Sequence, residues 1–179
     1  MYNQEHLNEA WFFAANAHKH QKYPRGDLPY LTHIGQVMME IMAVSPTLEN
    51  PELALLCAIL HDTLEDTAVT YEELQHRFSL AVANGVRALS KRASLPTKEA
   101  RMRDSLRRIQ TQPQEVWAVK LADRIANLGT PPEHWDSDKR RRYHQESMLI
   151  LETLGSANSI LARRLAQKIE HYASYFAFS

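Results

Sequence analysis

The stretch LALLCAILHDTLED, residues 53–66, decides how this chain folds and points to what it holds. Its first eight residues are apolar and predict a buried segment, and the last six place one histidine and three acids within two helical turns. Charged groups at the end of a buried segment need partners, because removing an unpaired charge from water is very costly. His61 and Asp62 offer an imidazole beside a carboxylate, which predicts the start of a metal site.

Composition predicts an all-α fold. The chain has 179 residues, 44% of them hydrophobic, which is enough for one domain with a sizeable core. It contains only five glycines, and runs of β-branched residues are scarce, so an all-β fold is disfavoured. We expect residues 1–179 to form a single domain, a helical bundle of about eight to ten helices.

Local signals predict where these helices lie. Asn50 can cap a helix whose first turn holds Pro51 and Glu52, and Thr70 with Glu73 forms a capping box. A residue before proline leaves the α conformation, so Ser45-Pro46 ends a helix. We expect helices at about 4–20, 33–44, 51–60, 79–91, 98–110, 113–128, 137–154 and 157–176, with a short one after Thr70.

The single cysteine, Cys57, cannot form an internal disulfide, and its place in the apolar run predicts a small core residue. This usage favours a reducing compartment. The N-terminus MYNQEHLNEA has no signal-peptide pattern, and no apolar stretch is long enough to span a bilayer. We therefore expect a cytoplasmic protein with no membrane partner.

Charge is distributed unevenly, although the formal net charge is zero. Residues 26–76 contain nine acids and no Lys or Arg, whereas residues 87–108 contain eight basic residues and two acids. An acidic segment suits a cation and a basic one suits phosphates, although either can be a solvated helix face. A neutral chain without a recognition motif gives little support to nucleic-acid binding, and we expect none.

Two more residues join the pair at 61–62 as candidate metal ligands. Asp123 lies within the apolar pattern VKLADRIANL at 119–128, where it could instead form a buried salt bridge to Lys120 or Arg124. His33 follows LPYLT at 28–32, where a rigid loop meets a helix. Two imidazoles and two carboxylates suit Mn²⁺, Fe²⁺, Co²⁺ or Zn²⁺ better than Ca²⁺.

The order His33, His61-Asp62, Asp123 resembles the H…HD…D signature of the HD-domain metal-dependent phosphohydrolases. Finer motifs resemble the hydrolase domain of RelA/SpoT-type proteins and the small metazoan SpoT-homologue hydrolases. These motifs are HKHQK at 18–22, LPYLTH at 28–33, HDTLED at 61–66 and VKLADRIANL at 119–128. The likeness covers about residues 5–150, and from the length of the chain we expect no synthetase domain.

The resemblance implies an enzyme that removes the 3′-pyrophosphate of guanosine tetra- and pentaphosphate, with Mn²⁺ held by His33, His61, Asp62 and Asp123. It implies that Glu65 and Asp66 activate the attacking water and handle protons; helical spacing puts them one turn from His61 and Asp62. By position, it implies substrate contacts from Lys22, Arg101, Asn127, Thr130, Lys139 and Tyr143.

The chain also departs from the family pattern. Ile34 stands where the family usually has proline, Ala126 replaces an aromatic residue or histidine, and the 21–29 loop is shorter. These changes leave open an adenosine alarmone or NADPH as substrate. The chain could also be an HD hydrolase of 5′-nucleotides or deoxynucleoside triphosphates, or a non-catalytic nucleotide sensor. In each case the expected partner is a small nucleotide, and the oligomeric state stays open.

Overall fold

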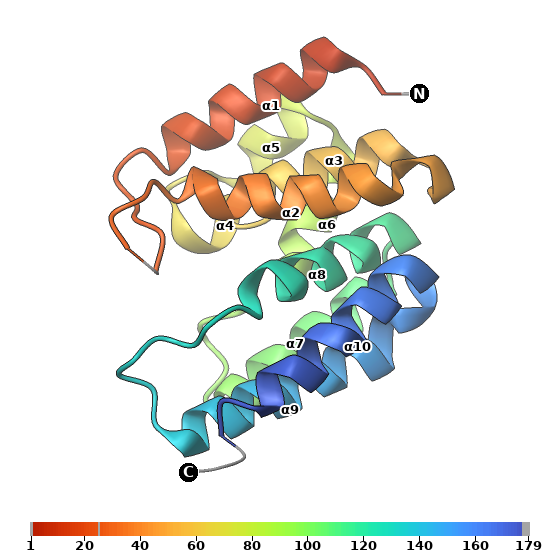
Figure 1. Cartoon of the computed structure of the whole chain (residues 1–179). Coiled ribbons are helices and arrows are strands. Elements are labelled where there is room, and N and C mark those ends of the chain that lie inside the picture. The colour runs from red at the N-terminus through yellow and green to blue at the C-terminus, as the bar shows by residue number, and fades with distance from the viewer. Residues whose placement is uncertain (1, 25, 177–179) are drawn as a thin grey trace.

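The computed structural model describes residues 2–24 and 26–176, and these residues form an all-α fold as predicted (Figure 1). The α-helices are α1 Gln4–Ala17, α2 Leu31–Val44, α3 Pro51–Leu60, α4 Thr63–Asp66, α5 Tyr71–Arg77, α6 Leu80–Leu89, α7 Lys98–Gln110, α8 Gln114–Asn127, α9 Ser137–Leu154 and α10 Ser159–Ala173. Two short 3-10 helices, Ser45–Thr47 and Gly155–Ala157, follow α2 and α9. Within the described part of the chain, no helix is both long and apolar enough to cross a membrane.

Capping side chains set the starts of several helices, as the sequence predicts. Asn50, Thr70, Thr97 and Asp136 each accept a hydrogen bond from the backbone N–H three residues later. Each cap satisfies a donor that would otherwise have no partner inside the helix. The predicted end of the first helix near residue 20 is wrong, because α1 ends at Ala17 and His18 leaves the helical conformation.

The segment that follows α3 forms a short separate helix that was not predicted from the sequence. Helical torsions continue through His61 (φ −53°, ψ −34°) and Asp62 (φ −100°, ψ 0°), but the regular ladder ends and α4 begins at Thr63. The Asp66 N–H donates to the Asp62 carbonyl oxygen at 2.9 Å. Asp62 and Asp66 therefore stay one turn apart, as the helical spacing requires.

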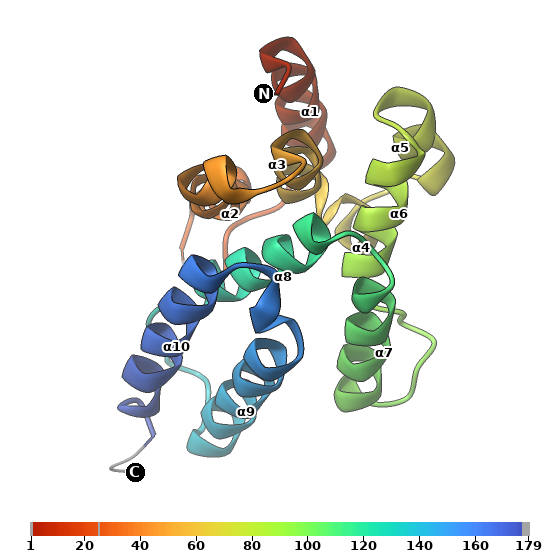
Figure 2. The same cartoon turned by 90° about the vertical axis from the view of Figure 1, so that its right-hand side faces the viewer.

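Helix α8 lies at the centre of the molecule. It packs on α2 and α3 on one side and on α9 and α10 on the other, which Figures 1 and 2 show from two directions. Ten of its 14 residues are buried, including the polar Lys120, Asp123 and Arg124. Polar groups so deep in the fold require partners, and these partners belong to the site described below.

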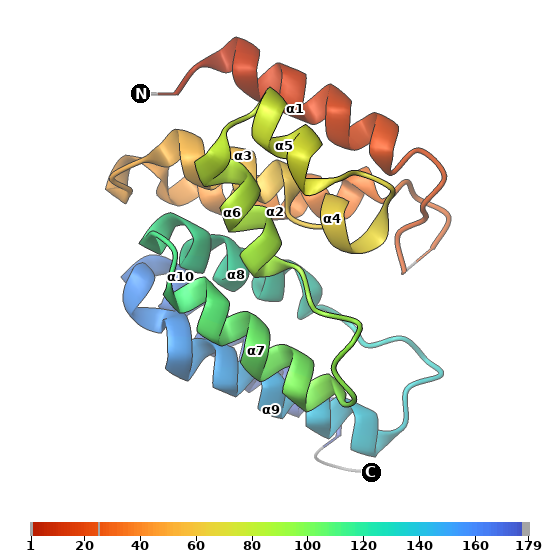
Figure 3. The same cartoon turned by 180° about the vertical axis from the view of Figure 1, so that it is seen from behind.

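Three connecting loops gather at one end of the bundle. The α1–α2, α6–α7 and α8–α9 loops lie on the same side as α4, as Figures 1 and 3 show from opposite directions. Residues of all three loops line one large cavity, including Tyr23, Lys91 and Trp135. The helices thus form a rigid frame, and the loops at this end surround the candidate site.

Helix α6 approaches α3 and α8 closely at Gly85. A methyl group at this position would lie 2.7 Å from Cys57 Sγ and 3.0 Å from Val116 Cγ2. We expect Gly85→Ala to lower the free energy of unfolding by about 1–3 kcal/mol through overpacking. Urea unfolding of the variant checks this value.

The same substitution in a Cys57→Ala background is the matched control. The smaller side chain removes the nearer sulfur atom, so Gly85→Ala should cost less there than in the natural chain. An equal cost in both backgrounds would show that the contact with the sulfur is not the source of the strain.

Candidate metal centre and active site

The structure brings together all four candidate metal ligands. His33 comes from the first turn of α2, His61 and Asp62 from the turn after α3, and Asp123 from the centre of α8. His33 Nε2 lies 3.2 Å from His61 Nε2 and 3.4 Å from Asp123 Oδ1. Asp62 Oδ2 lies 2.9 Å from His61 Nε2 and 3.7 Å from His33 Nε2.

The spacing of these atoms fits a divalent cation. Ligand atoms that bind one ion at about 2.1 Å lie roughly 3–4 Å apart, depending on the angle between the bonds. One atom from each of His33, His61 and Asp62 lies within 4.8 Å of the other two, and Asp123 Oδ1 lies 4.0 Å from His61 Nε2. A set of imidazole nitrogens and carboxylate oxygens suits a first-row transition metal.

Hydrogen bonding prepares His61 for this role. Its Nδ1 lies 2.9 Å from the Ala58 carbonyl oxygen, so the network assigns the Nδ1 proton to that bond. Nε2 then faces Asp62 and Asp123, the direction from which it would bind a metal once its own proton is released. The ring is buried, with 3% of the residue exposed, so its orientation is fixed by packing as well.

The electrostatics of the centre favour ionised carboxylates. Burial disfavours a charged imidazole, but Asp62 and Asp123 outweigh it and raise the pKa of His61 to about 9. Burial likewise opposes ionisation of Asp62, yet the charge and hydrogen bond of His61 hold the pKa of Asp62 well below its usual range. The two ionised carboxylates attract a cation, and a metal ion would displace the second proton of His61.

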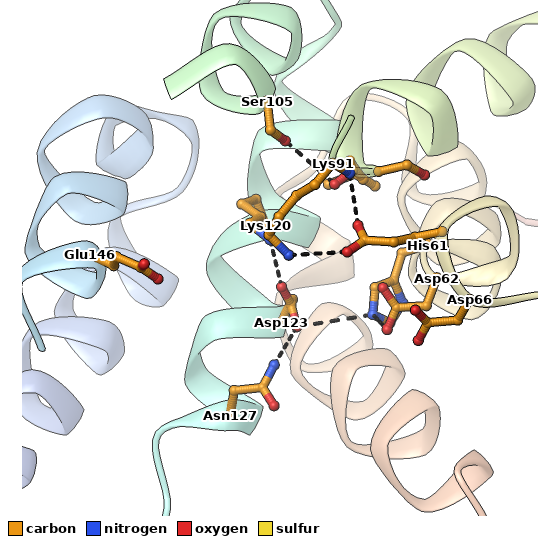
Figure 4. Close-up of polar contacts among 12 residues, drawn as sticks. His61, Asp62, Asp66, Lys91, Ser105, Lys120, Asp123, Asn127 and Glu146 are labelled. Atoms are coloured by element: carbon orange, nitrogen blue, oxygen red, sulfur yellow. Dashed lines mark hydrogen bonds and ion pairs between the residues drawn. The ribbon is translucent and has the colours of Figure 1, made fainter. Parts of the chain in front are cut away.

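Neighbours on α8 hold Asp123 in place. Lys120 Nζ donates to Asp123 Oδ2 at 2.8 Å, and Asn127 Nδ2 donates to Oδ1 at 2.6 Å (Figure 4). Both neighbours share one helix face with Asp123 because they lie three and four residues away. Burial opposes its charge, but Lys120 and His33 hold the pKa of Asp123 well below its usual range. The salt bridge to Lys120 that the sequence also allowed is thus present alongside the approach of Oδ1 to His33.

Tyr30 is a site residue that was not predicted from the sequence. Its hydroxyl donates to Asp62 Oδ2 at 2.5 Å, and its ring lies against His33 with centroids 5.4 Å apart. Burial and the charge of Asp62 raise the pKa of Tyr30, so the hydroxyl remains a donor. The only signal for it was its place in the LPYLTH motif.

The two acids proposed for proton handling lie beside the metal centre. Glu65 accepts hydrogen bonds from the Lys91 backbone N–H at 2.7 Å and from Lys91 Nζ at 3.4 Å. Asp66 accepts one from Gln21 Nε2 at 2.9 Å. Partial burial raises the pKa of Asp66, and the negative charges of Asp62 and Glu65 add to that effect. Both acids line the same cavity as Asp62, and Figure 4 shows Asp66 next to it.

This cavity has a volume of about 770 Å³, within the range of small-molecule sites. Glu146 faces it from α9, across from the metal centre (Figure 4). The walls of the cavity include seven basic side chains, which suit the phosphates of a nucleotide. These are Lys91, Lys98, Arg101, Lys120, Arg124, Lys139 and Arg142.

Four of the six predicted substrate contacts line the cavity, namely Arg101, Asn127, Lys139 and Tyr143. In the structure, the Arg101 guanidinium also donates hydrogen bonds to two backbone carbonyl groups. Its Nε donates to the Leu95 carbonyl at 2.8 Å and its Nη2 to the Ala93 carbonyl at 2.9 Å, so the guanidinium also holds the α6–α7 loop.

The other two predicted contacts lie outside the cavity lining. Lys22 pairs with Asp27 at 3.2 Å, and both side chains are exposed. The Thr130 hydroxyl lies 3.4 Å from the Tyr175 hydroxyl. In contrast, Trp135 lines the cavity although no motif singled it out, and Lys139 Nζ lies 4.4 Å from the centroid of its ring.

Comparison with known proteins agrees with this geometry. The model of the HD domain family matches residues 10–161. The zebrafish (Danio rerio) protein named guanosine-3′,5′-bis(diphosphate) 3′-pyrophosphohydrolase MESH1 is 32% identical over 90% of this chain and 91% of its own length. The Brucella melitensis protein named GTP pyrophosphokinase rsh is 34% identical over 85% of this chain, but the chain spans only 20% of that relative.

The solved structures give the same picture. A structure described as a metazoan ortholog of SpoT that hydrolyses ppGpp and plays a role in starvation responses superposes with a TM-score of 0.81 and 26% identity. The match covers 96% of this chain and 97% of that one. The chain therefore belongs to the HD-domain family, together with the MESH1 proteins.

Proposed function

We propose that this chain is a metal-dependent hydrolase that removes the 3′-pyrophosphate of alarmone nucleotides. The substrates would be (p)ppGpp or (p)ppApp, and the products GDP or GTP, or their adenosine equivalents, plus pyrophosphate. One observation carries this proposal: three candidate metal ligands lie within 4.8 Å of one another, with Asp123 3.4 Å from His33, beside Glu65 and Asp66 in a cavity whose walls hold seven basic residues. The activity for which the MESH1 relatives are named supports it, since they match nearly the whole chain.

The residues of the site suggest a division of roles. His33, His61, Asp62 and Asp123 would hold a divalent ion, for which we propose Mn²⁺. When bound, such an ion lowers the pKa of a coordinated water and polarises a phosphoryl oxygen. Lys120, Asn127 and Tyr30 keep the ligand carboxylates oriented through their hydrogen bonds.

Glu65 and Asp66 are the proposed acceptors of the proton that the attacking water loses. Their carboxylates stand on the cavity wall one turn from His61 and Asp62, so both lie next to the metal centre. For the substrate, we propose phosphate contacts from Arg101 and Lys139 and nucleoside contacts from Asn127 and Tyr143. Each of these residues lines the cavity.

Metal removal gives the direct test of the function. We expect purified protein to release pyrophosphate from guanosine 3′-diphosphate 5′-diphosphate in the presence of Mn²⁺. A chelator should abolish this release, and excess Mn²⁺ should restore it, because the activated water and the polarised phosphoryl oxygen both depend on the ion. The adenosine counterpart, measured in parallel, ranks the two bases.

Three results would point to a different function. Release of phosphate from the 5′ side instead of pyrophosphate from the 3′ side would indicate another HD-type nucleotide hydrolase. Tight nucleotide binding without cleavage, with Mn²⁺ bound, would indicate a sensor. Cleavage that survives complete chelation would contradict a metal-dependent mechanism.

We further propose that residues 1–179 act as one hydrolase domain in the cytoplasm with a small-molecule partner. The metal ligands come from α2, the α3–α4 turn and α8, and Glu146 of α9 completes the cavity wall. The site therefore needs both the early and the late helices. The buried free thiol of Cys57 is consistent with a reducing compartment.

A further inference from the structure

Two polar residues of the HKHQK motif have no role in the mechanism above, yet they connect to it. Gln21 lies in the loop after α1 and donates from Nε2 to Asp66 Oδ2 at 2.9 Å. The other end of the same amide, Oε1, lies 2.6 Å from His18 Nδ1. A chain of hydrogen bonds thus runs from His18 through Gln21 to a carboxylate proposed to take part in catalysis.

The direction of this chain is determined by its ends. An ionised Asp66 can only accept, so the amide must turn its NH₂ group toward Asp66 and its oxygen toward His18. His18 Nδ1 must then be the protonated ring nitrogen, and its N–H donates a hydrogen bond to the amide oxygen. The buried Nε2 of His18 has no hydrogen-bond partner among the described residues, so Gln21 is the partner that fixes this ring.

The surroundings make this arrangement rigid. His18 is 3% exposed, and its ring lies against Tyr30 with centroids 5.0 Å apart. The Gln21 backbone is held on both sides, because its N–H donates to the His18 carbonyl at 2.9 Å and its carbonyl accepts from the Tyr30 N–H at 3.0 Å. Tyr30 in turn donates to the metal ligand Asp62. The α1–α2 loop therefore contacts both acids, Asp62 through Tyr30 and Asp66 through Gln21.

Asp66 needs such support more than its neighbour does. It is the last residue of the four-residue helix α4, and the residue is exposed. The side chain faces an open cavity, so packing leaves it freedom to rotate. Glu65, by comparison, is held by two groups of Lys91. A misplacement of a reacting group by about 1 Å can cost about 100-fold in rate.

We propose that Gln21 is a positioning residue that holds Asp66 in its productive orientation, and that His18 fixes the orientation of the Gln21 amide. This inference rests on the proposed role of Asp66 in hydrolysis. It assigns to the α1–α2 loop a part in positioning a reacting group, carried out by an amide that is not among the residues lining the cavity.

The first test is Gln21→Ala. We expect kcat for pyrophosphate release to fall about 10- to 100-fold, with KM and the affinity for Mn²⁺ changed by less than about threefold. Gln21→Glu keeps the shape but cannot donate to Asp66, so it should lose at least as much. Lys19→Ala, in the exposed part of the same turn, is the matched control and should leave kcat unchanged.

His18 is tested by a rescue. His18→Asn places an amide N–H near the position of Nδ1, so it should retain most of the activity, whereas His18→Leu should behave like Gln21→Ala. Equal losses in the two His18 variants would mean that the ring acts only by packing, which would overturn its part in the proposal.

A double variant and a structure complete the test. If Gln21 acts through Asp66, then Gln21→Ala should have no further effect on kcat once Asp66→Asn is present; losses that multiply would overturn the inference. Crystal structures of the natural chain and of Gln21→Ala should show the Asp66 carboxylate turned away in the variant. This readout needs no substrate, so it decides whether Gln21 holds Asp66 even if neither alarmone is cleaved, and failure to cleave would refute the proposed function separately.

Discussion

Asp62→Ala should abolish Mn²⁺-dependent pyrophosphate release, lowering kcat/KM by about 10³-fold or more, which corresponds to about 4 kcal/mol of transition-state stabilisation. Asp62 supplies one of the two carboxylates of the centre and lies 2.9 Å from His61 Nε2. Its loss removes a proposed metal ligand and also removes the charge that Tyr30 and His61 face. Titration with Mn²⁺ should show binding weakened by at least about 100-fold.

The matched control is Glu72→Ala, which removes an exposed acid on α5. It should leave kcat/KM and the affinity for Mn²⁺ within about twofold of the natural chain, since exposed substitutions away from a site have small effects. Thermal unfolding of both variants separates loss of the site from loss of the fold. If Asp62→Ala bound Mn²⁺ as tightly as the natural chain does, Asp62 could not be one of the metal ligands.

Replacing the acidic pair should separate chemistry from metal binding. Glu65→Gln and Asp66→Asn preserve the volume and one acceptor oxygen of each side chain but remove its ability to accept a proton. We expect kcat to fall by about 10²–10⁴-fold for the residue that serves as general base, with KM changed far less. The affinity for Mn²⁺ should stay within about threefold, because neither acid belongs to the converging ligand set.

Glu99→Gln is the matched control, because Glu99 is another acid on the cavity wall without a proposed role in proton transfer. It should lower kcat by less than about threefold. Should both Glu65→Gln and Asp66→Asn retain nearly full kcat, the proton acceptor would have to be sought elsewhere in the cavity.

The sequence was most informative where local signals act. The apolar run at 53–60, the caps at Asn50 and Thr97 and the proline at Pro46 depend on neighbouring residues, and the structure confirms the helices they predict. The prediction that His33 and Asp123 belong to one site did not depend on signals from neighbouring residues. It came from the order and separation of the motifs, and the structure places the two side chains 3.4 Å apart.

The side-chain contacts that involve the loops were harder to predict. The ammonium of Lys22 pairs with Asp27 of its own loop, and Arg101 donates to carbonyls of the α6–α7 loop, so charge alone did not reveal what either side chain contacts. Tyr30 became a site residue because the loop before α2 turns its hydroxyl toward Asp62. Such contacts depend on tertiary packing, which overrides local preference.

The two acids beside the candidate metal centre differ in how sensitive their positions are to mutation of the residue that supports them. Glu65 receives its shortest hydrogen bond from the main-chain N–H of Lys91, a group that every residue except proline would also supply. Asp66 depends on the side chain of Gln21, so one codon can remove its support. In a library of all substitutions, selected for activity, proline should therefore be the most harmful residue at position 91, because other residues keep the shorter hydrogen bond to Glu65, while position 21 should accept almost none.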